Sequence, residues 1–323
     1  MVLIFVENVG GGFKKASLEA LSYGAAVAKM LGTQATALAL GTTTTEKLTE
    51  LGGYGVSKII CAADAALDSF DAQAHAQAIA QVAQNIGATL VVVANTYTGK
   101  SVAPRVAVRL NAALAPDAIA LPNIEGDKMR VQRTVFSNKG FAEISLNTPI
   151  KVIAVSPNSY PPTQTENTAT IETMSLNNLT FGTKSIAKNI ATGKIPLTEA
   201  EIVVSGGRGL KAPENWHLIE DLATVLGAAT ACSKPVSDLN WRPHSEHVGQ
   251  TGITIKPNLY IATGISGAIQ HLAGVSGSKV IVAINTDKDA PFFKIADYGI
   301  IGDAFEVLPQ LTRAITHYKI QNQ

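Results

Sequence analysis

The sequence has little charge, few aromatic residues and almost no cysteine. Of its 323 residues 16% are charged and 6% are aromatic, and 26 Lys and Arg stand against 25 Asp and Glu, which gives a formal net charge of +1. A chain without an excess of positive charge has no electrostatic attraction for nucleic acids or anionic membranes. We therefore expect its partner to be a small molecule or another protein.

The two cysteines, Cys61 and Cys232, lie far apart and match no metal-binding or redox spacing. We expect them to be small buried residues in a protein kept in a reducing compartment. The apolar run at the N-terminus ends at Glu7, too early for a secretory signal, and no run of about 18 apolar residues occurs that could span a membrane. A soluble, cytoplasmic protein is the expectation.

Apolar residues are plentiful, at 46%, and the length suffices for two domains. The first part of the chain alternates strand-like runs (residues 2–7, 35–40, 58–62 and 89–94) with helical patterns (residues 14–31, near 46, and 71–86). Alternation of this kind is typical of a parallel sheet covered by helices. Residues 118–156 then carry strand patterns without helices, and the turn-like SNKG at 137–140 predicts an antiparallel hairpin that extends the sheet.

Residues 157–197 are rich in Asn, Thr, Ser and Pro, with one strand-like piece, ATIETMS. This composition predicts a boundary or an arm that packs on the first domain. The alternation then restarts and continues to a last helical pattern at 305–318. The predicted fold class is α/β, with two domains that each contain a parallel sheet, residues 1–194 and residues 195–323.

ANTYTGKS, residues 94–101, differs by one residue from the phosphate-binding pattern G-x-x-x-x-G-K-[ST], because Ala94 stands where the first Gly belongs. Without that Gly the backbone cannot wrap around a phosphate as the pattern requires. We expect a plain turn from a strand into a helix that starts within residues 98–101, with Pro104 in its first turn.

HSEH, residues 244–247, offers two imidazoles and a carboxylate, but not in the order H-E-x-x-H and with no third ligand close in the sequence. A surface loop is the expectation, and no metal site is predicted.

GISGA, residues 264–268, resembles the nucleophile pattern G-x-S-x-G except for Ala268 at the last position. On a helix, His271 would point about 140° away from Ser266, so the two cannot form a nucleophile and its base. We expect Ser266 to be the N-cap of the helix, with the N–H groups of Gly267 and Ala268 available to an anion. No catalytic residue is predicted.

Four predicted strands of the second domain end in small or polar residues: SGGRG after Val204, ACS up to Ser233, GISGAIQH after Ala262, and AIN up to Asn285. The carboxyl ends of parallel strands share one edge, and that edge holds the ligand. Glycines let the backbone approach a pyrophosphate, and Arg208 can neutralise its charge. The pattern predicts a dinucleotide site, but the absence of G-x-G-x-x-G gives no support for a nicotinamide-dependent dehydrogenase.

These segments, in their order, resemble the alpha subunit of electron transfer flavoprotein. The resemblance runs from Ile202 to Asp303 through VVSGGRGLK, VGQTG, LYIATGISGAIQHLAG, VIVAIN and PFFKIADYGIIGD. The first domain is similar mainly in the order of its strands and helices.

The resemblance implies an adenine-nucleotide-hydrolase-like domain at 1–194, which contacts a partner and has no cofactor of its own, and a Rossmann-like FAD-binding domain at 195–323. It implies a heterodimer with a beta subunit. Electrons would come from acyl-CoA dehydrogenases and related dehydrogenases, as in fatty acid beta-oxidation, and would pass to a membrane quinone oxidoreductase. The chain would be an electron carrier and not an enzyme; the alternative is a nucleotide-dependent oxidoreductase that uses the same crevice.

By matching position, the resemblance assigns a set of residues to FAD: Arg208, Ser233, Lys234, Val248, Gly249, Gln250, Thr251, Ser266, Gly267, Ala268, Ile269, Gln270, His271, Asn285 and Asp303.

Within this set the resemblance implies particular roles. Thr251 would offer its hydroxyl to the flavin N5, and Gln250 and Gln270 would make polar contacts. His271 would lie at the pyrimidine end of the ring, where a donor or a cation stabilises negative charge. Asp303 would accept hydrogen bonds from ribose hydroxyls.

One residue departs from the family pattern. Many members have Ser-Arg where this sequence has Ser233-Lys234. Lysine keeps the positive charge of arginine but loses its planar fork, so we expect Lys234 to contribute charge while holding the flavin less rigidly.

Overall fold

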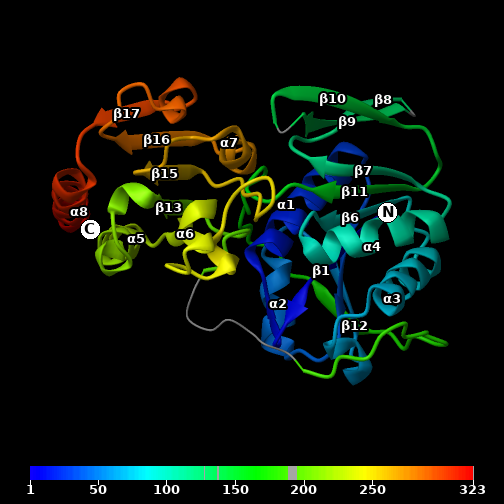
Figure 1. Ribbon diagram of the computed structural model, residues 1–323. Helices are drawn as coiled ribbons and strands as arrows, with labels where there is room; N and C mark the ends of the chain where they lie inside the picture. Colours follow the sequence, from blue (N-terminus) through cyan, green and yellow to red (C-terminus); the bar gives the residue numbers. More distant parts are fainter. Residues whose placement is uncertain (127, 137, 188–194, 323) are drawn as a thin grey trace. The chain divides into compact units, whose positions relative to one another are not determined.

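The computed structural model describes residues 1–126, 128–136, 138–187 and 195–322 (Figure 1). It divides into two compact units: unit 1 holds most of the chain up to residue 187, and unit 2 holds residues 195–322 together with residues 136, 138 and 139. The predicted boundary between 194 and 195 falls at the edge of a segment outside the described residues, so it stays a prediction.

Unit 1 is built on a ten-stranded sheet whose central strands are parallel and run in the order β5-β4-β1-β6-β11-β7. The strand bounds are β1 (Val2–Val6), β4 (Ala35–Leu40), β5 (Lys58–Ala62), β6 (Leu90–Ala94), β7 (Ala113–Ala118) and β11 (Lys151–Val155). The strand order reverses between β1 and β6. The chain first adds β4 and β5 on one side of β1, and then places β6 on the other side of β1.

The predicted hairpin is confirmed. β9 (Lys128–Val135) and β10 (Gly140–Leu146) pair antiparallel and extend the sheet, and the short β8 (Asn123–Glu125) pairs with β9. The predicted arm also packs on this unit, because β12 (Thr170–Thr173) adds to the opposite edge, parallel to β5. A second, two-stranded sheet is formed by β2 (Asn8–Val9) and β3 (Gly12–Phe13).

Helices cover both faces of the unit 1 sheet. Successive residues of β1 point to opposite faces, so Ile4 belongs to the core beneath α1 (Lys15–Met30) and α2 (Thr45–Gly52). Phe5 belongs to the core beneath α3 (Ala72–Asn85) and α4 (Tyr97–Arg109), which lie side by side (Figure 1). The uninterrupted apolar run of β1 is thus explained by burial on two sides.

Helix α4 begins earlier than the sequence predicts. Thr96 is its N-cap, since its hydroxyl accepts a hydrogen bond from Gly99 N at 3.0 Å, and Pro104 consequently lies inside the helix. The prediction that Pro104 stands in the first turn is wrong. A Cβ on Gly99 would lie 1.7 Å from the carbonyl oxygen of Ala94. Packing against the backbone therefore explains why this residue is glycine, and no bound phosphate is needed to explain it.

Unit 2 contains five parallel strands in the order β14-β13-β15-β16-β17. Their bounds are β13 (Ile202–Gly206), β14 (Ala229–Cys232), β15 (Leu259–Thr263), β16 (Val280–Asn285) and β17 (Tyr298–Ile301). One face is covered by α5 (His217–Leu226) and α8 (Ala304–Gln321), and the other by α7 (Ile269–Val275) and η5 (Pro291–Lys294). The order reverses between β13 and β15, which marks the switch point where sheets of this kind bind ligands.

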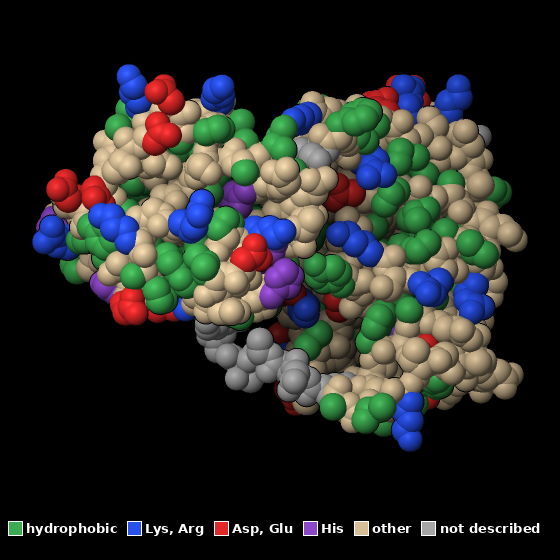
Figure 2. All heavy atoms as spheres, viewed as in Figure 1, with side chains coloured by type: hydrophobic (Ala, Val, Ile, Leu, Met, Phe, Trp, Pro, Cys, Tyr) green, Lys and Arg blue, Asp and Glu red, His purple; other side chains and the backbone are tan. Residues whose placement is uncertain are grey.

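Charges of both signs are interspersed on the visible face of each unit, as the balanced composition predicts (Figure 2). Among the helices of the described residues, none is both long enough and apolar enough to cross a membrane.

Candidate functional site

The candidate site lies at the C-terminal edge of the unit 2 sheet. Backbone hydrogen bonds tie the strand ends to one another: Ser233 N donates to Gly206 O (3.1 Å), Gly207 N to Thr263 O (2.9 Å), Gly264 N to Ile284 O (2.9 Å) and Gly302 N to Asn285 O (3.0 Å). The four segments that the sequence singles out are therefore brought together, as predicted.

Three glycines meet at the switch point. A Cβ on Gly207 would lie 2.2 Å from Gly264 O, and one on Gly209 would lie 2.6 Å from Gly264 Cα. Gly264 itself has φ +61°, and its Cβ would lie 2.8 Å from Gly209 Cα. No side chain fits here, so the loops after β13 and β15 run backbone against backbone. Glycine-rich backbone at a switch point can approach a pyrophosphate closely.

Residues 248–252, which we call the strap, lie against α7. Val248 N donates to Cys232 O (3.0 Å) and Gln250 N donates to Gln270 O (2.7 Å). A Cβ on Gly274 of α7 would lie 2.5 Å from Gly249 Cα, so the strap and the helix also touch through glycines. The strap thereby carries the exposed side chains of Gln250 and Thr251 to the same edge of the sheet.

Ser266 is not the N-cap of α7, and that prediction is wrong. The helix begins at Ile269 with Ala268 as its N-cap. Gly267, at φ +89°, turns the chain between Ser266 and the helix, and the carbonyl of Ser266 instead accepts from Phe292 N at 3.1 Å. Within the described residues, the N–H groups of Gly267 and Ala268 donate to no protein acceptor, so they remain suited to an anion.

Gln270 and His271 have different environments. Gln270 is exposed, whereas His271 is 6% exposed, because neighbouring residues on a helix point about 100° apart. The Nε2 atom of His271 lies 2.8 Å from the hydroxyl of the fully buried Tyr260, and its ring packs edge-on against Phe292. Nothing in the sequence distinguishes Tyr260 from the apolar residues of the same strand.

The buried position of His271 determines its charge. Burial, reinforced by the neighbouring His247, lowers its pKa to about 4, so the imidazole is neutral at pH 7. Of the two implied roles, donor or cation, this pKa favours the neutral donor in the protein without FAD. Nδ1 of His271 and Nδ1 of His247 are both buried and have no hydrogen-bond partner among the described residues, which makes them polar atoms suited to a ligand.

This pKa predicts how stability depends on pH. The pKa of His271 falls from 6.5 to about 4 on folding, so the unfolded chain binds the proton more readily than the folded chain. The contribution of neutral His271 to the free energy of unfolding is therefore fully present above about pH 6.5 and is lost as the pH falls toward 4. Between pH 7 and pH 5 the loss from His271 is about 2 kcal/mol. Urea unfolding followed by the fluorescence of Trp216 and Trp241, both in unit 2, measures it. In His271→Gln the pH dependence should shrink by that amount, and an unchanged pH dependence would contradict the assignment.

Two predicted site residues use their side chains for local structure. Asn285 Nδ2 donates to Ile265 O at 3.0 Å and so holds the loop that follows β15. Asp303 is the N-cap of α8, since Oδ1 accepts from Phe305 N at 3.0 Å, and Oδ2 lies 3.5 Å from Lys211 Nζ.

Three further residues of the set assigned to FAD lie next to the ends of β13 and β14. Arg208 follows β13 and is exposed, and Lys234, at the start of α6 (Lys234–Asp238), is also exposed. Ser233 is buried as the residue before that helix.

The expectation of a surface loop at HSEH is wrong for half of it. His244 is exposed, but Glu246 and His247 are 6% and 2% exposed. Glu246 is buried because Arg242 binds both of its oxygens at 2.7 Å, a bidentate pair that raises the pKa of the guanidinium. The described residues contain no group of side chains able to hold a metal ion.

Arg242 links the strap to the switch point. It also binds Glu220 at 2.9 Å and lies over the ring of Trp216, 5.4 Å from its centre. That ring packs on Gly206, where a Cβ would come within 2.7 Å. No sequence pattern predicted this network, because Arg242 lies in a bend and Glu246 in a short 3-10 turn, where the helical i, i+4 rule does not apply.

Comparisons with known proteins agree over most of the chain. The family described as electron transfer flavoprotein domain matches residues 2–179, and that described as electron transfer flavoprotein FAD-binding domain matches residues 196–276. The electron transfer flavoprotein subunit alpha of Bacillus subtilis is 39% identical over 277 residues, 84% of this chain and 85% of that protein. Protein FixB of Clostridium saccharobutylicum is 36% identical over 96% of this chain and 94% of its own length. The subunit alpha of Syntrophomonas wolfei is 34% identical over 95% of this chain and 96% of its own.

Proposed function

The chain belongs to the alpha-subunit family of electron transfer flavoproteins, with FAD as cofactor, and we propose that it works as a heterodimer with a beta subunit. The complex accepts electrons from acyl-CoA dehydrogenases and related dehydrogenases and passes them to a membrane quinone oxidoreductase. Residues 1–194 contact the partner, and residues 195–323 bind FAD. Bound FAD supplies the redox chemistry, since its ring system takes up and releases electrons.

The observation that carries this proposal is the contact of Gly207 and Gly209 with Gly264 at the switch point. It leaves bare backbone where the pyrophosphate of FAD can approach. Arg208, exposed within the same loop, neutralises the phosphate charge, and the N–H groups of Gly267 and Ala268 bind its oxygens.

The strap and α7 contact the flavin ring. Thr251 and Gln250 reach it from the strap, and Gln270, whose carbonyl accepts from Gln250 N, reaches it from the helix. His271 acts there as a neutral hydrogen-bond donor, because its pKa of about 4 leaves it uncharged at pH 7. Tyr260 holds the ring of His271 in place through its Nε2 atom.

The remaining members of the set shape the site or add charge. Lys234 supplies a positive charge near the ring, without the fork that an arginine would offer. Asn285 keeps the loop after β15 in position. Asp303 accepts hydrogen bonds from the ribose hydroxyls. Its carboxylate caps α8 and contacts Lys211, and its two oxygens can accept further hydrogen bonds.

Expression together with the beta subunit tests the proposal. We expect a yellow complex whose flavin is reduced by an acyl-CoA dehydrogenase with its substrate, and not by NADH or NADPH alone, as followed by absorbance. The dehydrogenase without substrate is the control. Reduction by a nicotinamide cofactor alone would favour the nucleotide-dependent oxidoreductase instead, and a colourless complex after addition of FAD would refute both.

A further inference from the structure

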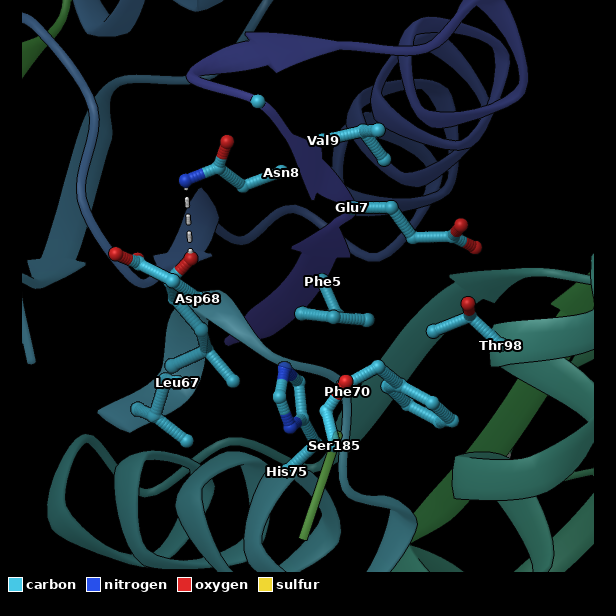
Figure 3. Close-up of a pocket in the computed structure, with 12 residues that line it drawn as sticks. Phe5, Glu7, Asn8, Val9, Leu67, Asp68, Phe70, His75, Thr98 and Ser185 are labelled. Carbon is cyan, nitrogen blue, oxygen red and sulfur yellow. Dashed lines mark hydrogen bonds between the residues drawn. The ribbon is translucent and has the colours of Figure 1, made fainter. Parts of the chain in front are cut away.

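Unit 1 has a pocket of about 390 Å³ at the C-terminal edge of its sheet (Figure 3). This volume falls in the range of pockets that hold small molecules. Glu7, directly after β1, and Asn8, the first residue of β2, line it, and Thr98 lines it from α4, which follows β6. The pocket therefore adjoins the point where the strand order reverses between β1 and β6, the position at which α/β sheets bind ligands.

One part of the lining is apolar and aromatic. Phe5, Leu40 and Leu67 lie there, and the rings of Phe70 and His75 are 5.0 Å apart (Figure 3). Phe70 is 44% exposed although it is a large apolar side chain, so its ring is available to a flat partner. Aromatic faces of this kind stack on heteroaromatic rings.

The other part consists of hydrogen-bond acceptors held in place. Glu7 accepts a hydrogen bond from the hydroxyl of Thr96, and Asp68 accepts from Thr42 N at 2.6 Å and from Thr42 Oγ1 at 3.0 Å. Fixed carboxylates favour ligands that donate hydrogen bonds. Among the described residues that line the pocket there is no Lys or Arg, so a phosphate would meet two negative charges and no positive one.

His75 adds a neutral imidazole. Its Nδ1 lies 3.0 Å from the backbone carbonyl oxygen of Asp71 and 3.4 Å from the backbone nitrogen of Asp71, and a neutral imidazole has one donor and one acceptor nitrogen. Burial lowers the pKa of His75, which keeps the ring neutral.

The arm closes one side of the pocket. Asp71 Oδ2 accepts from Gly182 N (3.0 Å), Thr183 N (2.8 Å) and Thr183 Oγ1 (2.7 Å). These bonds attach the arm beside α3 and bring Ser185 to the pocket. The enclosure is thus built by specific contacts between segments far apart in the sequence.

We propose that this pocket binds an uncharged nucleoside, with its base against Phe70 and His75 and its amino and hydroxyl donors directed to Glu7 and Asp68. Size, position at the switch point, an exposed aromatic face and an acceptor-rich, cation-free lining all fit this ligand class. Every residue that lines this pocket belongs to unit 1, whereas the residues assigned to FAD belong to unit 2.

Calorimetry on the FAD-loaded heterodimer tests this inference, with adenosine as the probe and the flavin spectrum as a check that FAD stays bound. We expect saturable binding of adenosine in the millimolar range or tighter, and binding of AMP at least about tenfold weaker because of charge repulsion. Equal or tighter binding of AMP, or no binding of adenosine at about 10 mM, would overturn the proposal. Binding of a diamine such as putrescine in place of adenosine would overturn it too.

Variants locate the binding. Phe70→Ala should weaken adenosine about tenfold, since stacking on an aromatic ring contributes that much. Phe141→Ala is the matched control, because Phe141 is also exposed in unit 1 but does not line the pocket. Asp68→Asn should reduce the difference in affinity between adenosine and AMP, because it removes one of the two negative charges that repel the phosphate. Equal losses in Phe70→Ala and Phe141→Ala would place the adenosine elsewhere.

Discussion

Replacing Gly264 with alanine is expected to remove most of the bound FAD and to lower the free energy of unfolding of unit 2 by about 2–4 kcal/mol. Two effects combine at this residue. Gly264 has φ +61°, which an L side chain rarely adopts, and the new Cβ would lie 2.8 Å from Gly209 Cα, a backbone atom that cannot move aside cheaply. The loops that approach the pyrophosphate would be forced apart. The ratio of flavin to protein and urea unfolding followed by tryptophan fluorescence measure the two losses.

Gly227→Ala separates the two effects. Gly227 ends α5 with φ +67°, nearly the same backbone conformation, but a Cβ there meets nothing within 4 Å. In Gly227→Ala the free energy of unfolding should fall by about 1 kcal/mol because of backbone strain, and the bound FAD should be retained. If Gly264→Ala retained FAD as well as Gly227→Ala does, the contact between the glycine loops would not be what shapes the site.

Arg242→Met is expected to destabilise unit 2 by about 3–5 kcal/mol, because it leaves the carboxylate of Glu246 buried without its bidentate partner. The methionine also loses the charge that lies over Trp216. Since Glu246 immediately precedes His247 and the strap, FAD retention should fall in parallel. Urea unfolding and flavin content measure both effects.

The double variant Arg242→Met with Glu246→Leu is the control. Removing both charges leaves no buried charge unpaired, since Glu220, the other partner of Arg242, is exposed, so most of the stability should return. Flavin content then tells whether the ion pair also positions the strap, because a stable double variant with low flavin content would show positioning beyond stability. A loss below about 1 kcal/mol in Arg242→Met would mean that solvent screens this pair as it screens exposed ones.

The outline of the fold was predictable because its signals are local. Apolar runs alternating with helical patterns predict parallel sheets, and the turn SNKG predicts the hairpin of β9 and β10, which the structure confirms. The arm was predictable from composition, but its pairing with β5 was not, because β12 has no long apolar run and is exposed along its whole length. Local signals misplaced the starts of α4 and α7, because the capping residues that define them depend on detailed turn geometry.

The candidate site divides in the same way. By itself the sequence determined which strand ends carry glycine and polar residues, and hence the edge at which a dinucleotide would bind, because strand periodicity and residue type are written along the chain. Only the tertiary structure decided that His271 is neutral against Tyr260 and that Arg242 neutralises Glu246. Charge state and packing depend on burial and on which distant segments come together, and no local pattern encodes either.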